Sequence, residues 1–200
     1  MINTLLFDFG DIFVNLRKEA TAQAFQQLGI NLFTADVAEL NNAYEIGAIS
    51  EMDFLTGIQK QNPATATLAI RSAWNQIIGD FPLYRLEFLQ LLKSKYRLFL
   101  LSNTDATHIR YFEQQVGLSF SRDFYNCFEK VYFSYEMGLR KPDPVCFQTV
   151  LAQHELQPKH TLFIDDKKEN TDAAAALGMP VWNLQVGKED VVELFDKKII

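Results

Sequence analysis

The sequence has little cysteine and no long hydrophobic run. Its 200 residues contain two cysteines, Cys127 and Cys146, without CxxC spacing. This cysteine usage favours a reduced compartment and buried or inert thiols. The start, MINTLLFDFG, lacks the basic stretch, apolar run and small-residue cleavage site of a secretory signal. No apolar run approaches the roughly 20 residues that a membrane-spanning helix needs. We therefore expect a soluble, cytoplasmic protein.

Positive charge is also scarce. Lys and Arg number 19 and Asp and Glu number 25, which gives a net charge of −6 at pH 7. Nucleic acid and anionic lipid surfaces attract proteins with a basic field, so we expect neither as a partner. The three histidines, His108, His154 and His160, show no metal-ligand spacing. We expect them on helix or loop surfaces and expect the chain to be a monomer or a weak homodimer.

Short apolar runs alternate with helical periods along most of the chain. Five runs predict buried strands: Thr4 to Phe9, Arg97 to Leu101, Lys130 to Phe133, Thr161 to Ile164 and Pro180 to Leu184. Helical periods lie between them, at Leu83 to Tyr96, Ala106 to Val116, Pro144 to His154 and Glu169 to Leu177. This alternation predicts an α/β fold with a Rossmann-like, doubly wound parallel sheet.

Residues 15–80 interrupt the alternation, because they are almost wholly helical in character. Ser50 to Asp53 (SEMD) has the pattern of a capping box, and Asn62-Pro63 has the pattern of another helix start. The sequence therefore predicts a helical cap of residues 15–80 inserted after the first strand. Residues 1–14 and 81–200 are then expected to form the α/β core, without internal repeats.

Four short segments carry the polar residues of a candidate site. FDFGD follows the first strand, LSNTD the second and IDD a later one, while GLRKPDP leads into a helix. Open α/β sheets bind ligands at the carboxyl ends of their strands, where three of these segments lie. Taken singly, each segment is commonly only a turn, a helix cap or a solvated surface. The residues alone indicate an α/β domain with an acidic, metal-binding site.

Together, the four segments resemble the haloacid dehalogenase (HAD) superfamily. Its pattern is an Asp after the first strand, a Ser or Thr after the second, a Lys before a helix and an acidic pair after a fourth strand. The resemblance extends from Asp8 to about Leu184 and is closest to the bacterial glucose-1-phosphate phosphatase branch, which shares FDxG, LSNT, GxRKP and FxDD…N. It implies a magnesium-dependent phosphatase whose partner is a small-molecule phosphate ester, such as a sugar phosphate.

The resemblance also implies a metal set. Asp8 would attack phosphorus to give an aspartyl phosphate that water then hydrolyses. A carboxylate repels an anionic substrate, so Mg²⁺ would bridge the two, bound by Asp8, the Gly10 carbonyl and Asp166. Asp165 would support this set, and Asn170 would hold a metal-bound water.

Three further residues would bind the phosphoryl group. By the resemblance, Lys141 would offset the charge of Asp8 and of the transferring group as a compact cation. Ser102 and the amide of Asn103 would donate hydrogen bonds to phosphoryl oxygens. The segment from Tyr44 to Phe54 is where the resemblance places specificity contacts that face the active site.

Gly10 departs from the commonest pattern. Most phosphatases of the superfamily have a second Asp there, which protonates the leaving oxygen. Dehalogenases also lack it, so a 2-haloacid dehalogenase is one alternative, although the acidic pair at Asp165 and Asp166 favours magnesium and phosphate. A catalytically weak phosphate-binding or regulatory module is another. Asp11 is a candidate acid, but we favour a structural role for it, and anomeric phosphates would depend least on the missing acid.

Overall fold

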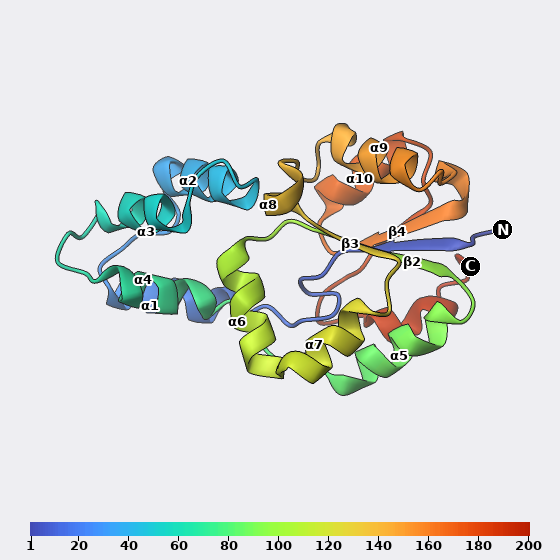
Figure 1. Cartoon of the computed structure of the whole chain (residues 1–200), viewed down its shortest axis with the longest axis horizontal. Coiled ribbons are helices and arrows are strands. Elements are labelled where there is room, and N and C mark those ends of the chain that lie inside the picture. The colour runs from blue at the N-terminus through green and yellow to red at the C-terminus, as the bar shows by residue number, and fades with distance from the viewer.

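A five-stranded parallel sheet forms the centre of the computed structural model, which describes residues 1–200 (Figure 1). The strands are β1 (Thr4–Phe7), β2 (Arg97–Ser102), β3 (Lys130–Phe133), β4 (Thr161–Asp165) and β5 (Val181–Asn183). They lie in the order β3-β2-β1-β4-β5, with Phe7 opposite both Leu100 and Ile164. The order reverses between β1 and β4, so the predicted doubly wound α/β fold is confirmed.

Helices cover both faces of this sheet (Figure 1). One face packs against α5 (Leu83–Lys93), α6 (Ala106–Val116), α7 (Leu118–Tyr125) and the 3-10 helix η2 (Val191–Phe195). The other face packs against α9 (Pro144–Gln153) and α10 (Lys168–Ala176). The short α8 (Ser134–Met137) follows β3, and the 3-10 helix η1 (Pro158–His160) precedes β4.

Alternate strand residues build two separate cores, because successive side chains of a strand point to opposite faces. Leu5 and Phe7 belong to the larger core, which includes the apolar residues of α5, α6 and α7. Leu6, Phe99 and Phe163 belong to the core under α9 and α10. The central strands are therefore apolar on both faces, as parallel strands covered by helices must be.

The chain between β1 and α5 forms a helical insertion at one side of the sheet (Figure 1). It consists of α1 (Lys18–Gln27), α2 (Ala35–Glu45), α3 (Glu51–Gln59) and α4 (Thr67–Asn75). These helices share a core of their own, which includes Phe25, Phe54 and Ile70. The two connections to the sheet run together, since Leu16 bridges Ile78 and the Asn15 N–H donates to the Asp80 carbonyl at 2.9 Å.

One of the two predicted helix starts in the insertion is present in the structure. The capping box is confirmed, since Ser50 Oγ accepts from Asp53 N at 3.1 Å and Asp53 Oδ2 accepts from Ser50 N at 3.2 Å. The helix start at Asn62 is wrong, because α4 begins at Thr67. Asn62 instead donates its side-chain N–H to the Leu28 carbonyl at 2.9 Å, so it ties the loop to the end of α1.

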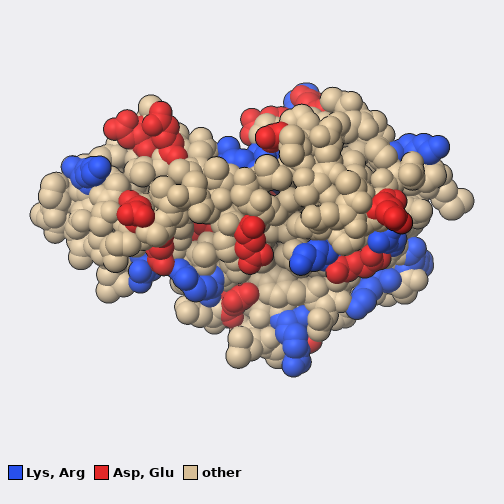
Figure 2. All heavy atoms as spheres, turned by 45° about the horizontal axis from the view of Figure 1, so that its top comes forward, with Lys and Arg blue, Asp and Glu red and all other residues tan.

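The charge distribution, the lengths of the helices and the state of the two cysteines were also open to comparison with the sequence. Figure 2 shows a face on which acidic and basic side chains are interspersed, with no continuous basic surface. No helix combines the length and the apolar character needed to cross a membrane. Cys127 and Cys146 are both buried and unpaired.

Candidate active site

The carboxyl ends of three neighbouring strands bring the predicted site residues together. Asp8 directly follows β1, Ser102 ends β2 and Asp165 ends β4. β1 and β4 are the strands between which the sheet order reverses, which is where α/β sheets form a crevice. Asp8 and Asp165 are both buried, with relative exposures of 8% and 0%. Two buried carboxylates at one point need a cation.

Lys141 is that cation. Its Nζ donates to Asp8 Oδ1 and to Asp165 Oδ2, each at 2.7 Å, and its side chain is buried. The ammonium also lies 5.3 Å from the centroid of the Phe163 ring. Burial alone would lower the pKa of Lys141, but the charges of Asp165 and Asp8 outweigh it and raise the pKa. Lys141 is therefore a permanent positive charge between the two carboxylates.

The Asn103 side chain fixes the backbone of Lys141. Its Oδ1 accepts from the Lys141 N–H at 2.9 Å, and its Nδ2 donates to the Lys141 carbonyl at 2.8 Å. The loop after β2 is held in turn by Ser134, whose Oγ accepts from Thr104 N at 2.9 Å. The Ser102 hydroxyl makes no hydrogen bond to the protein, which leaves it free for a ligand. The sequence suggests the Asn103 amide as a group that binds the phosphoryl oxygens. It does not predict the hydrogen bonds of the Asn103 side chain to the Lys141 backbone.

Asp165 and Asp166 have different surroundings. Asp165 Oδ1 accepts from Lys167 N at 2.7 Å, and Asp165 Oδ2 accepts from Asn170 Nδ2 at 2.9 Å as well as from Lys141. The Asp166 carboxylate accepts no hydrogen bond, and burial raises its pKa. Asn183, a residue the sequence did not single out, donates to the Asp166 carbonyl at 2.8 Å. Asp166 thus has the freer carboxylate of the pair.

The acidic residues fit a hard divalent cation. Asp8, Asp165 and Asp166 each offer a carboxylate oxygen, and these oxygens lie within 4.8 Å of one another. An all-oxygen set is the kind that Mg²⁺ prefers. Asn170 Oδ1 is buried without a hydrogen-bond partner, an arrangement that a metal-bound water would satisfy. Burial raises the pKa of Asp8 to about 7, although the charge of Lys141 lowers it. Further positive charge, such as a bound metal ion, would favour the ionised form of Asp8.

Leu16 fills the space beside Gly10. A Cβ added at Gly10 would lie 2.9 Å from Leu16 Cδ1, so a larger residue would have to displace that side chain. Asp11 adopts a left-handed conformation with φ of 57°. Its Oδ1 accepts from Leu16 N at 2.9 Å and its Oδ2 accepts from Lys18 Nζ at 2.7 Å. Both oxygens are engaged within the turn, which agrees with the structural role favoured for Asp11.

The histidine prediction is wrong for His108. Its residue is 8% exposed, and its ring stacks on Trp74 with centroids 4.9 Å apart. His108 lies on α6 and meets α4 of the insertion, so the long-range packing of two helices buried a residue that the local pattern left on a surface. His154 and His160 are half-buried.

The segment from Tyr44 to Phe54 packs against the sheet-bearing part. Tyr44 and Phe54 stack on each other inside the insertion, with ring centroids 4.6 Å apart. The acidic side chains of the segment reach outward, since Glu45 pairs with Arg140 at 3.0 Å and Glu51 pairs with Arg110 at 2.5 Å. The aromatic residues of this segment are therefore internal, and its acids join the insertion to α6 and to the residue before Lys141.

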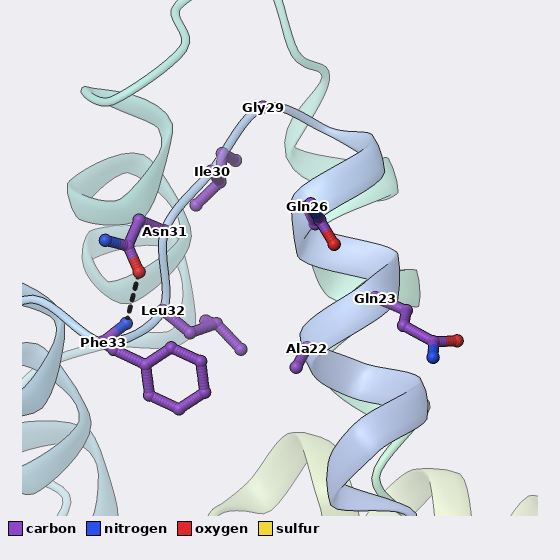
Figure 3. A pocket seen from close by; sticks show the side chains of 8 residues that line it. All are labelled: Ala22, Gln23, Gln26, Gly29, Ile30, Asn31, Leu32 and Phe33. Carbon is purple, nitrogen blue, oxygen red and sulfur yellow. Dashed lines mark hydrogen bonds between the residues drawn. The ribbon is translucent and has the colours of Figure 1, made fainter.

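A separate hollow of about 460 Å³ lies within the insertion, between α1 and the loop that follows it (Figure 3). Its lining is uncharged and consists of Ala22, Gln23, Gln26, Gly29, Ile30, Asn31, Leu32 and Phe33. None of the acidic residues at the strand ends contributes to it. The candidate active site is therefore the cluster around Lys141 rather than this hollow.

Known proteins resemble the chain over nearly its whole length. The family model described as haloacid dehalogenase-like hydrolase matches residues 2–178. D-Ribitol-5-phosphate phosphatase of Bacteroides thetaiotaomicron is 26% identical over 94% of this chain and 95% of its own.

Two solved structures of a HAD family enzyme from Bacteroides thetaiotaomicron have the same fold. Its magnesium complex is 33% identical with a TM-score of 0.88, covering 97% of this chain and 98% of that one. The complex with magnesium and inorganic phosphate is 32% identical with a TM-score of 0.84, covering 98% and 100%. The predicted superfamily and enzyme class are confirmed: the chain belongs to the haloacid dehalogenase-like hydrolases.

Proposed function

We propose that this hydrolase is a magnesium-dependent phosphatase that cleaves a small phosphorylated sugar or sugar alcohol through an aspartyl-phosphate intermediate. The observation that carries the proposal is the buried contact of Lys141 with both Asp8 and Asp165, at 2.7 Å each, beside the freer carboxylate of Asp166. The phosphate complex of the similar Bacteroides enzyme supports the phosphoryl ligand, and the D-ribitol-5-phosphate phosphatase supports the substrate class.

Asp8 is the proposed nucleophile. Its Oδ1 accepts the Lys141 hydrogen bond, and its Oδ2 has no hydrogen-bond partner in the protein. A carboxylate oxygen of Asp8 forms the new bond to phosphorus as the bond from phosphorus to the ester oxygen breaks; the leaving oxygen takes its proton from water and departs as the alcohol. Water then attacks phosphorus and releases inorganic phosphate, which regenerates the carboxylate. Mg²⁺, held by Asp8, the Gly10 carbonyl and Asp166 with Asp165 and Asn170 in support, would supply positive charge for the phosphoryl oxygens.

The remaining polar residues are proposed to bind the phosphoryl group. The free Ser102 hydroxyl and the Asn103 amide would donate hydrogen bonds to its oxygens. The Lys141 ammonium would offset the negative charge of the transferring group as well as that of Asp8. The Asn103 side chain fixes the backbone of Lys141 for this contact. In a site this buried, each such contact is stronger than it would be in water.

Gly10 limits the choice of leaving group. No carboxylic acid stands at position 10, and both oxygens of Asp11 are engaged. Anomeric phosphates, which release a good leaving group, would depend least on a protein acid. The D-ribitol-5-phosphate phosphatase acts on a primary phosphate ester, so the two arguments favour different members of one substrate class. A substrate panel separates them.

We further propose that residues 15–80 act as a cap over the site. The turn after α2 supports this, because Gly47 has φ of 68° and a Cβ there would lie 2.4 Å from the Tyr135 carbonyl oxygen. The turn thus lies directly against α8, close in sequence to Lys141. A unit placed there would exclude water from the phosphoryl transfer.

The test is phosphate release from glucose 1-phosphate, ribitol 5-phosphate, other sugar phosphates, a nucleotide and an aryl phosphate, with magnesium or with chelator. Turnover that needs magnesium, vanishes in Asp8→Asn and persists in the exposed control Asp123→Asn would support the proposal. Halide release from a 2-haloacid without metal would instead identify a dehalogenase. Binding of phosphate and magnesium without turnover of any ester would identify the phosphate-binding module.

A further inference from the structure

A lysine that the sequence did not single out contacts the site from the insertion. Lys18 is the first residue of α1, where the chain passes from the sheet into the helices. Its Nζ lies 2.7 Å from Asp11 Oδ2 and 3.8 Å from Asp166 Oδ2. Its side chain is 57% exposed, whereas those of Asp11 and Asp166 are 5% and 10% exposed. One largely exposed ammonium therefore faces two well-buried carboxylates.

Asp11 is held so that it must face Lys18. Its backbone N–H donates to the Val14 carbonyl at 2.8 Å, and its Oδ1 accepts from Leu16 N at 2.9 Å. With the backbone and one oxygen fixed, the other oxygen is left for the ammonium. Asp11 thereby keeps Lys18 within reach of Asp166 rather than free in solvent.

Asp166 has no other side-chain cation within salt-bridge distance. Lys141 pairs with Asp8 and Asp165 instead, so the positive charge that contacts Asp166 is that of Lys18. A divalent cation bound to Asp166 would be close to this ammonium, and like charges repel. Before the metal arrives, the same ammonium offsets part of the negative charge that would attract it.

We infer that Lys18, anchored by Asp11, is a counter-ion that weakens Mg²⁺ binding at Asp166 and so sets the metal affinity of the site. This inference rests on the proposed function, because it assumes that Asp166 binds magnesium. It assigns the turn from Gly10 to Lys18 a task other than proton transfer. It also makes the first residue of α1 responsive to the metal, since the ammonium loses its contact with Asp166 when the metal binds that carboxylate.

The inference predicts opposite effects from the two partners. Lys18→Met removes a positive charge and frees the negative charge of Asp11, so Mg²⁺ should bind more tightly. Asp11→Asn removes a negative charge and leaves Lys18 with Asp166 alone, so Mg²⁺ should bind more weakly; asparagine tolerates the left-handed backbone of this position. Solvent screens the exposed ammonium, so we expect changes of about three- to tenfold in Kd.

The experiment is calorimetric titration of Mg²⁺ into metal-stripped protein at constant ionic strength, without substrate. It compares wild type with Lys18→Met, Asp11→Asn and Lys18→Arg, which keeps the charge. The control is Lys159→Met, at an exposed lysine of η1, which precedes β4 and so lies at the opposite end of the strand from Asp165. A lower Kd for Lys18→Met, a higher Kd for Asp11→Asn and unchanged values for Lys18→Arg and Lys159→Met would support the inference. A merely structural role would shift both partners' variants in the same direction.

If wild type binds Mg²⁺ and Lys18→Met binds it with the same or a higher Kd, the inference is overturned and the proposed function stands. Failure of the wild type to bind Mg²⁺ at all would overturn both. Thermal unfolding of each variant in chelator shows which proteins are folded. If Lys18→Met does not fold, Asp11→Asn decides: an unchanged or lower Kd in that variant would overturn the inference.

Discussion

Replacing His108 with alanine is expected to loosen the joint between the insertion and the sheet-bearing part. His108 Nδ1 lies 3.0 Å from Asp105 Oδ2, and His108 Nε2 lies 3.1 Å from the Trp74 carbonyl oxygen. Both partners are hydrogen-bond acceptors, so the ring can satisfy both only as the doubly protonated imidazolium. Trp74 Nε1 also donates to Asp105 Oδ2 at 3.0 Å, which joins α4 and α6 through one carboxylate.

The expected loss is large because the carboxylate is buried. The Asp105 side chain is 1% exposed. Removing one partner of a buried ion pair costs about 3–5 kcal/mol, since the other charge is left uncompensated. Asp105 keeps the backbone N–H groups of Thr107 and His108 and the Trp74 indole, so we expect about 3 kcal/mol for His108→Ala. In a protein of this length that corresponds to a decrease in Tm of about 6–12 °C.

The pH dependence gives the sharper test. Burial alone would lower the pKa of His108, but the Asp105 carboxylate outweighs burial and raises the pKa. A raised folded-state pKa means that the stabilisation is fully present below the ordinary histidine value of about 6.5 and is lost as the pH rises through the folded-state value. The difference in unfolding free energy between wild type and His108→Ala should therefore shrink toward alkaline pH.

Denaturant unfolding between about pH 6 and pH 9 measures this difference. His160→Ala is the matched control, because the His160 ring makes no hydrogen bond to the protein and its loss should leave stability within about 0.5 kcal/mol of wild type. A loss below about 1 kcal/mol for His108→Ala, or a difference from wild type that stays constant with pH, would refute the imidazolium.

Substitutions of Asn103, Lys141 and Gly10 test the site. Asn103→Ala leaves both backbone groups of Lys141 unpaired, so kcat should fall about a hundredfold, with Asn103→Asp, which still accepts one bond, losing less in steady-state kinetics. Lys141→Met leaves Asp8 and Asp165 without their cation, so the unfolding free energy in chelator should fall by about 3–5 kcal/mol. Magnesium should stabilise this variant more than wild type, and equal stabilisation of the two would count against the arrangement. Gly10→Asp should gain turnover of alkyl esters relative to anomeric ones in the same substrate panel only when Leu16→Ala opens the space, and a gain without Leu16→Ala would contradict the packing.

Local sequence patterns predicted the sheet-bearing part well, because its elements are defined by contiguous burial. The ranges Ala106–Val116 and Lys130–Phe133 match the predicted ones. The first strand ends at Phe7 rather than Phe9, since Phe9 leaves the ladder and packs on Phe112 with ring centroids 5.0 Å apart. Periodicity showed that residue 9 is buried, but only the tertiary contact shows that it is buried outside the sheet.

The candidate site was predictable as a meeting of residues but not as a network. Strand order follows from general rules, so Asp8 and Asp165 could be placed at one edge of the sheet in advance. The two hydrogen bonds between Asn103 and Lys141 join residues 38 positions apart, in loops whose conformations no local pattern specifies. A side chain with both a donor and an acceptor next to a strand end is compatible with such a clamp, but it does not identify Lys141 as the partner.

The packing around Gly10 shows why position 10 has no acidic side chain. The sequence reveals that no acid stands at position 10, and it leaves open whether the space is empty for water or substrate. In the structure Leu16 lies against that position, and the turn that places Leu16 there is fixed by Asp11 Oδ1. Asp11 thus holds Leu16 in the space that a side chain at position 10 would occupy, while its other oxygen accepts from Lys18. An acid added at position 10 alone would meet this packing, so a change of leaving group requires change in the whole turn.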